Sequence, residues 1–155
     1  MKVWRICNKK FLASAFSGEG AKLWGGRWNE VGQPMVYTAG NLSLAALETF
    51  VQLDSDLMPD ELVAIAATIP EKLKITKIKL TNLPLNWRDY PAPDAIKQIG
   101  MDWIASQESA VLVVPSVVIP EEENWLINPA HPDFRRIKIN NELPFSFDPR
   151  MWKIK

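Results

Sequence analysis

Residues 25–48 form the segment that most constrains the fold, because three kinds of local structure follow one another there with little chain between them. Gly25 and Gly26 open the segment and let the backbone approach a neighbouring group closely. Residues 36–39 are an apolar run typical of a short strand, and residues 42–53 repeat apolar side chains at helical spacing. The helical set is Leu44, Leu47, Phe50 and Val51, with Asn41 or Ser43 as the N-cap. The segment therefore predicts a strand followed directly by the first long helix.

Each piece of this segment carries one polar side chain that could serve a ligand site. The planar guanidinium of Arg27 can hold a phosphate through two parallel hydrogen bonds. The ring of Tyr37 can form a flat pocket wall while its hydroxyl stays available. Glu48 lies at the edge of the apolar helix face, beside Gln52, where a carboxylate can face a cleft without entering the core. The alternative for Glu48 is a surface glutamate that pairs along its own helix, and periodicity alone does not decide between the two.

The rest of the chain alternates strands and helices without internal repeats or low-complexity linkers. Further strands are predicted over residues 3–6, 62–69, 73–80, 110–114, 117–119 and 134–139. Turns and loops are predicted over residues 54–60, 87–93, 121–123 and 128–133. A second helix begins at its predicted cap, Asp94, and places Ile96, Ile99, Trp103 and Ile104 on one face. Because the order lacks a regular strand–helix–strand alternation, we expect a single α+β domain over residues 1–155, with a mixed sheet and two main helices.

Composition narrows the functional classes. The 18 lysines and arginines balance 18 aspartates and glutamates, and no basic run with interleaved aromatic residues occurs, which argues against direct nucleic-acid binding. With Cys7 the single cysteine and only one histidine present, no disulfide framework or metal-ligand cluster is expected. Residues 1–11 lack the features of a signal peptide, and the apolar runs, including residues 110–114, are too short to span a membrane. We expect a cytoplasmic, metal-free protein.

Several other residues allow a functional and a structural interpretation. Ser116 follows a strand-breaking proline and could donate a hydrogen bond to a ligand, but no G-x-S-x-G pattern surrounds it, so a hydrolase nucleophile is excluded. In the loop after residue 127, Asn128 and His131 could contact a ligand or simply order the loop. Trp24 and Trp28 could stack on an adenine ring or serve as packing.

The order of motifs provides a more specific signal. The pattern GGRWN-x5-MVYTA-x4-LAALE, followed by VLVVPS and N-x-LINP-x-HPDF, resembles the RES domain family, which is the toxin half of bacterial toxin–antitoxin pairs. The resemblance runs from Val3 to about Phe134. The family is named for an arginine, a glutamate and a serine, which are accompanied by a tyrosine. The matching residues here are Arg27, Glu48, Ser116 and Tyr37.

The resemblance implies a fold related to ADP-ribosyltransferases and consumption of NAD+ by cleavage of the bond between nicotinamide and ribose. Departure of nicotinamide leaves an oxocarbenium-like ribose, which Glu48 would stabilise. Arg27 would hold the pyrophosphate, Tyr37 would pack on the nicotinamide ring, and Ser116 would bond to nicotinamide or its ribose. The expected NAD+-binding residues are Arg27, Tyr37, Ser116, Trp28 and Asn128, and the expected catalytic residues are Glu48, Arg27, Tyr37 and Ser116.

The resemblance leaves the acceptor open, since water, phosphate or a protein side chain could receive the ADP-ribosyl group. The chain could thus be an NAD+ glycohydrolase or phosphorolase, a mono-ADP-ribosyltransferase acting on a protein, or a nucleotide-binding module without catalysis. The resemblance also implies a cognate antitoxin, a helix-turn-helix DNA-binding protein of the Xre type that blocks the pocket. Self-association as a homodimer is expected as well.

Overall fold

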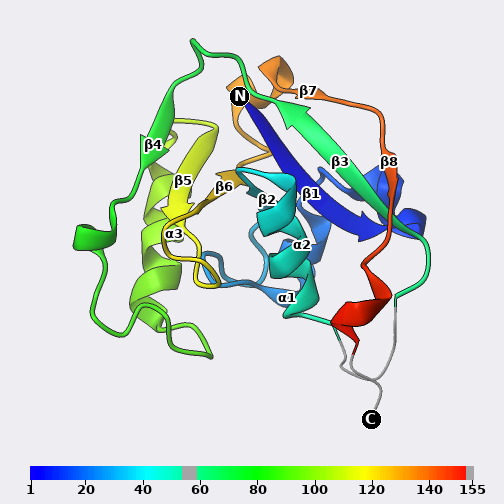
Figure 1. The fold of residues 1–155 in the computed structure, drawn as a ribbon. Helices are drawn as coiled ribbons and strands as arrows, with labels where there is room; N and C mark the ends of the chain where they lie inside the picture. Colours follow the sequence, from blue (N-terminus) through cyan, green and yellow to red (C-terminus); the bar gives the residue numbers. More distant parts are fainter. Residues whose placement is uncertain (54–58, 153–155) are drawn as a thin grey trace.

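The structure, a computed structural model, describes residues 1–53 and 59–152. Its strands form one sheet in the order β4-β5-β6-β2-β1-β3-β7, and β8 also pairs with β3 (Figure 1). The strands are β1 (Lys2–Asn8), β2 (Val36–Ala39), β3 (Leu62–Thr68), β4 (Ile75–Lys77), β5 (Val111–Pro115), β6 (Glu123–Ile127), β7 (Lys138–Ile139) and β8 (Leu143–Phe145). Because β4 and β5 are parallel and the other pairs are antiparallel, the sheet is mixed, and the α+β prediction is confirmed.

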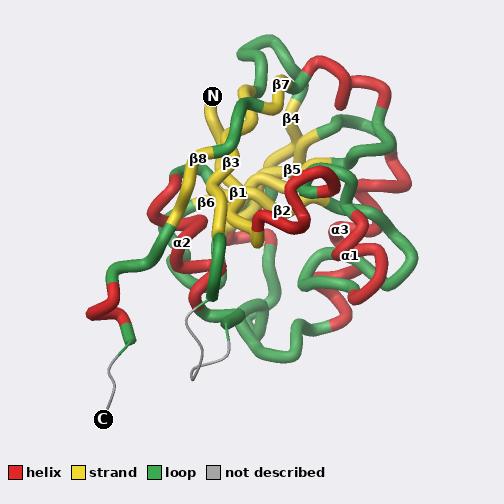
Figure 2. The backbone as a smooth tube through the Cα atoms, turned by 90° about the vertical axis from the view of Figure 1, so that its right-hand side faces the viewer, coloured by secondary structure: helices red, strands yellow, loops and turns green. Residues whose placement is uncertain are grey.

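Short and long helices connect these strands. The α-helices are α1 (Glu19–Trp24), α2 (Leu42–Phe50) and α3 (Asp94–Ser106), and 3-10 helices cover Lys9–Ser14, Leu80–Asn82, Pro132–Arg136 and Pro149–Met151. Figure 2 shows α2 well apart from α1 and α3. None of the helices in the described parts of the chain is both long enough and apolar enough to cross a membrane.

The pairing of β2 with β6 places two polar side chains on one face of the sheet. Tyr37 pairs with Leu126, and Ala39 pairs with Asn124. Since side chains alternate along a strand, these four residues share a face. Leu126 packs in the core cluster that includes the buried side of α3, whereas Ala39 packs in the cluster that includes α2. Tyr37 and Asn124 therefore lie on the face to which both helices contribute.

The first segment of the chain folds as the sequence predicts. Strand β2 covers the predicted residues 36–39, and α2 follows after two residues. Asn41 is the N-cap of α2, because its side-chain oxygen accepts a backbone N–H of the first turn at 2.8 Å. The helix ends at Phe50, three residues earlier than predicted. Of the turn predicted over residues 54–60, residues 54–58 lie outside the described residues.

The largest difference from the sequence prediction lies just after β5. Residues 117–119 are not a strand, because the hydroxyl oxygen of Ser116 accepts the N–H groups of Val118 and Ile119 and closes a turn. The strand that pairs with β5 is β6, which begins at Glu123 in a stretch predicted as a solvated acidic turn. The acidic residues favoured the prediction of a turn, although β6 begins among them and its last three residues are buried.

Smaller differences concern element ends. Of the strand predicted over residues 73–80, only β4 pairs in the sheet. The strand predicted over residues 134–139 is reduced to β7, because Pro132–Arg136 forms a 3-10 helix. Asp94 is the first residue of α3, and Pro93 occupies the N-cap position that was predicted for it. The predicted buried face of α3 is confirmed for Ile96, Trp103 and Ile104.

Candidate active site

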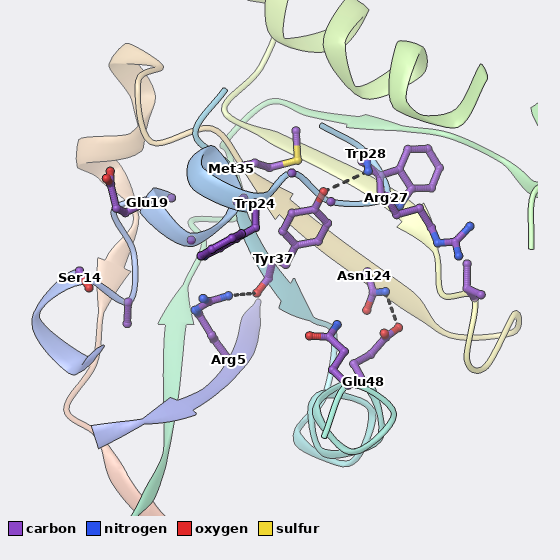
Figure 3. A pocket seen from close by; sticks show the side chains of 18 residues that line it. Arg5, Ser14, Glu19, Trp24, Arg27, Trp28, Met35, Tyr37, Glu48 and Asn124 are labelled. Carbon is purple, nitrogen blue, oxygen red and sulfur yellow. Dashed lines mark hydrogen bonds between the residues drawn. The ribbon is translucent and has the colours of Figure 1, made fainter. Parts of the chain in front are cut away.

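A cavity of about 390 Å³ opens beside β2, between the loop that follows α1 and the last turns of α2 (Figure 3). Arg27, Tyr37 and Glu48 all line it, so three of the predicted site residues meet in one place. A smaller cavity of about 180 Å³ lies against the same strands. Glu48 and Asn124 line both cavities.

The carboxylate of Glu48 is held from one side. Its Oε1 accepts a hydrogen bond from the hydroxyl of Ser116 at 2.7 Å and another from Nδ2 of Asn124 at 2.6 Å. Its Oε2 accepts no hydrogen bond from the described residues. Two donors on a single oxygen limit the rotation of the carboxylate. The interpretation of Glu48 as an ordinary surface residue is therefore not supported.

Ser116 lies behind Glu48 and does not line the cavity. Its side chain is fully buried, and its hydroxyl oxygen accepts the two backbone N–H groups that close the turn. The single hydroxyl proton is donated to Glu48. A direct bond from Ser116 to a ligand stays a prediction, and in this structure the hydroxyl is enclosed and its proton is engaged by Glu48.

Tyr37 forms a wall of the cavity and also fixes the neighbouring loop. Its hydroxyl donates to Oδ1 of Asn29 at 2.6 Å and accepts the backbone N–H of Trp28 at 3.1 Å. Burial raises the pKa of Tyr37 above that of an ordinary phenol, so the ring is neutral at physiological pH. A side chain at Gly26 would place its Cβ 2.5 Å from the tyrosine hydroxyl. The glycine is thus required for the loop to approach the ring.

Asn29 explains why this loop keeps its shape. The side chain is fully buried, and its Nδ2 donates to three backbone carbonyls, those of Ala21, Glu30 and Gln33. Its Oδ1 accepts the proton of the Tyr37 hydroxyl. Every polar atom of the amide is therefore used to tie α1, the loop and β2 together.

Two arginines face the cavity. Nη1 of Arg27 donates to the carbonyl of Trp87 at 2.9 Å, and Nη1 of Arg5 donates to the carbonyl of Tyr37 at 3.1 Å. Burial lowers the pKa of both guanidinium groups, and for Arg27 the charge of Glu48 opposes that effect. Arginine stays protonated at neutral pH even so. The Nε of Arg5 is buried without a hydrogen-bond partner among the described residues.

Sequence reasoning missed Arg5 and Asn124 as site residues. A signal for Arg5 exists, since it is a cation within a strand predicted to be apolar. Asn124 opens the N-x-LINP motif, but its role depends on the strand β6 that was not predicted. Gln52, one turn after Glu48, also lines both cavities.

The remaining predicted residues divide between cavity and core. Trp24 and Trp28 both line the cavity, but Trp24 is 84% exposed, whereas Trp28 is 2% exposed and also packs in the core against α3. Asn128 lies outside the cavity, and its Oδ1 accepts the N–H of Ala130 at 3.0 Å. His131 caps the following 3-10 helix through its Nδ1. For Asn128 and His131 the structure supports the loop-ordering interpretation.

The described part of the chain contains no group of three or more histidine, cysteine, aspartate or glutamate residues that could hold a metal ion.

Comparison with known proteins decides the family. The RES domain matches residues 2–148 of this chain. The chain belongs to the RES domain family. The resemblance inferred from the GGRWN, MVYTA and LAALE motifs is thereby confirmed.

Full-length relatives support the assignment. The chain is 43% identical over 152 residues to the Prs ADP-ribosylating toxin of Sphingobium sp., covering 96% of this chain and 94% of the relative. It is 38% identical to Toxin Res of Yersinia enterocolitica, covering 97% and 99% of the two chains. Among solved structures, the MbcT–MbcA toxin–antitoxin complex of M. tuberculosis matches with a TM-score of 0.74 at 12% identity, over 97% of this chain and 86% of that chain. The chain is thus a RES-type toxin with the MbcT fold.

Proposed function

We propose that this RES toxin consumes NAD+ by cleaving the bond between nicotinamide and ribose. The observation that carries the proposal is the Glu48 carboxylate, held through Oε1 alone, in a cavity that also contains the guanidinium groups of Arg27 and Arg5. In a site that only bound an anionic nucleotide, a carboxylate would repel the pyrophosphate, and its one use would be to accept a ribose hydroxyl. A carboxylate stabilises the transition state if positive charge develops beside it during the reaction.

The chemistry of NAD+ matches this set of groups. Nicotinamide carries its positive charge before the bond breaks and departs as a neutral ring, so no acid is needed to protonate the leaving group. The charge moves to the ribose, which becomes oxocarbenium-like. A fixed carboxylate stabilises this state more than the ground state and therefore raises the rate. Tyr37, which is neutral and hydrogen-bonded, contributes a ring surface for nicotinamide rather than a proton.

The two arginines would hold the pyrophosphate. Arg27 and Arg5 approach the cavity from the loop after α1 and from β1, so they could contact different phosphate oxygens. Trp24 is the exposed aromatic side chain at the cavity and could stack on the adenine ring. Trp28 would act indirectly, because its backbone N–H holds the hydroxyl of Tyr37.

The acceptor of the ADP-ribosyl group defines a second candidate function. Water or phosphate would make the protein an NAD+ glycohydrolase or phosphorolase. A relative at 43% identity is named as a toxin that ADP-ribosylates Prs, which favours transfer to a protein as the alternative. Both reactions share cleavage of the nicotinamide bond and differ only in what attacks the ribose.

Product analysis with the purified chain tests the proposal. NAD+ is incubated with the parent protein, with and without phosphate, and nicotinamide and the ADP-ribosyl product are identified by mass spectrometry. We expect nicotinamide release to persist in EDTA, since the proposed mechanism uses no metal ion. Absence of release at high enzyme concentration would favour a non-catalytic nucleotide-binding module. Activity that is lost in EDTA and restored by a divalent ion would contradict the metal-free mechanism.

We also propose a cognate antitoxin of the Xre type that covers the Arg27–Glu48 cavity, and a toxin that forms a homodimer. The fold match to the toxin chain of a toxin–antitoxin complex supports the first part. Expression of the chain alone should arrest bacterial growth, whereas Glu48→Ala should be tolerated, and the neighbouring gene product should restore growth by stopping NAD+ loss. Co-purification of a partner that leaves NAD+ turnover unchanged would show that the partner does not block the Arg27–Glu48 cavity.

A further inference from the structure

Asn124 links two parts of the site that are far apart in the sequence. It lies in β6, on the face shared with Tyr37, and its Nδ2 donates to Oε1 of Glu48 at 2.6 Å across 76 positions of sequence. Figure 3 shows its amide pointing at the carboxylate from the strand side. Asn124 also lines both cavities.

We propose that Asn124 is a positioning residue for Glu48, and that with Ser116 it keeps one carboxylate oxygen engaged so that the other faces the substrate. The inference rests on the proposed NAD+ cleavage. Both donors approach Oε1, at 2.6 and 2.7 Å, and Oε2 accepts nothing from the described residues. A carboxylate held in this way presents one oxygen, in one orientation, to a developing positive charge.

The energetics of the amide support a functional role. The Oδ1 of Asn124 is buried and has no hydrogen-bond partner among the described residues. A buried acceptor without a partner costs about 1–3 kcal/mol, so burying it lowers stability. Rotating the amide would bring Oδ1 against the carboxylate, where two acceptors repel. The orientation of the amide is therefore determined by its contact with the Glu48 carboxylate.

Other groups around Glu48 do not duplicate this contact. Arg27 and Arg5 supply positive charge in the same cavity, but neither guanidinium donates a hydrogen bond to the carboxylate. Tyr37 is neutral and donates to Asn29. Gln52, an uncharged side chain, lines the cavity just past the C-terminal end of α2. Within the described residues, the orientation of the carboxylate thus depends on Ser116 and Asn124.

The Asn124→Asp variant distinguishes an effect on the Glu48 carboxylate from a loss of folding. The replacement keeps the shape but puts a second carboxylate against the first, and such a pair takes up a proton at higher pH than a single group does. A shared proton would neutralise part of the charge that Glu48 must supply. We expect the acid limb of the pH–rate profile to move upward by about one pH unit or more, with NAD+ turnover at alkaline pH rising but staying below that of the parent, because the donor to Glu48 is lost.

Asn124→Ala removes the donor without adding charge. We expect kcat to fall by about tenfold to a hundredfold while KM changes by less than about threefold, because the ground-state contacts of NAD+ remain. Asn140→Asp is the matched control, since Asn140 is a half-buried asparagine that bonds β3 and is remote from the cavity. It should lower thermal stability and leave the acid limb in place.

The experiment compares five versions of the 155-residue chain made by cell-free synthesis, the parent, Asn124→Asp, Asn124→Ala, Asn140→Asp and Glu48→Gln, by nicotinamide release from pH 5 to 9. An upward shift in Asn124→Asp alone, together with the kcat loss in Asn124→Ala, is the expected result. Parent-like kcat in Asn124→Ala with an inactive Glu48→Gln would overturn the positioning role only. Should Asn124→Asp fail to fold, the split between kcat and KM in Asn124→Ala decides the question alone. Full activity in Glu48→Gln would overturn the proposed function itself.

Discussion

The two walls of the cavity are built by different interactions. On the loop wall, Gly26, Asn29 and Tyr37 meet through close approach and neutral hydrogen bonds. On the carboxylate wall, Glu48 and Asn124 meet through a charge-assisted hydrogen bond between a helix and a distant strand. The difference indicates that the two walls have different functions. The loop wall sets the shape that binds substrate, and the carboxylate wall sets the charge that acts in the transition state.

Removing a charge from the loop wall should affect binding most. Arg27→Ala should raise KM for NAD+ by about tenfold to a hundredfold, since charge-assisted hydrogen bonds to a phosphate contribute about 1.5–3 kcal/mol. Arg27→Lys should recover only part of the loss, because an ammonium group does not form the paired hydrogen bonds of a guanidinium. Steady-state kinetics measures both. A parent-like KM in Arg27→Lys would show that the guanidinium geometry is unimportant, and a parent-like KM in Arg27→Ala would contradict the binding role of Arg27.

A methyl group at Gly26 should disrupt the shape of the same wall. The added Cβ would lie 2.5 Å from the hydroxyl and 2.9 Å from the ring carbon of Tyr37, so Gly26→Ala should destabilise the fold by about 1–3 kcal/mol. Gly20→Ala is the control, because a Cβ there meets nothing within 4 Å and the residue lies in α1. That variant should be neutral or stabilising by up to about 1 kcal/mol. Urea unfolding of both proteins distinguishes them, and equal stabilities would contradict the packing argument.

Tyr37→Phe should give the smallest of these effects. It leaves the ring in place but removes the donor to Asn29, which should lower the free energy of unfolding by about 1–2 kcal/mol. The raised pKa of Tyr37 adds a pH signature: the folded state holds its phenolic proton more tightly than the unfolded state, so this contribution is complete below about pH 10 and is lost as pH rises further. Tyr37→Phe should therefore lose less stability than the parent above that pH. If the free energy of unfolding of Tyr37→Phe and of the parent depended on pH in the same way, the raised pKa of Tyr37 would be contradicted.

The same contrast explains what could be predicted from sequence. Arg27, Tyr37 and Glu48 lie within a segment of 22 residues, and the order of their motifs, through the resemblance to the RES domain family, put them at one site where periodicity alone did not decide. Asn124 reaches Glu48 only because β6 pairs with β2, and strand pairing between distant segments is not encoded in local patterns.

Ser116 shows a different limit of sequence reasoning. Its importance followed from the family motif, but whether its hydroxyl met a ligand or the catalytic carboxylate depended on the turn at Val118 and Ile119. In this structure the turn encloses the hydroxyl. A motif identifies a residue type and a position, whereas the direction of a single O–H bond comes from the surrounding backbone.

Binding and turnover of NAD+ by Glu48→Gln test directly whether the charge of Glu48 drives cleavage of the nicotinamide–ribose bond. The amide preserves the shape of the side chain and removes its charge, so the account predicts an NAD+ affinity, measured by titration calorimetry, within about threefold of the parent value. The same protein should release nicotinamide about a hundredfold more slowly or worse, because the oxocarbenium-like state loses its counter-charge. A parent-like rate of nicotinamide release from Glu48→Gln would contradict the account.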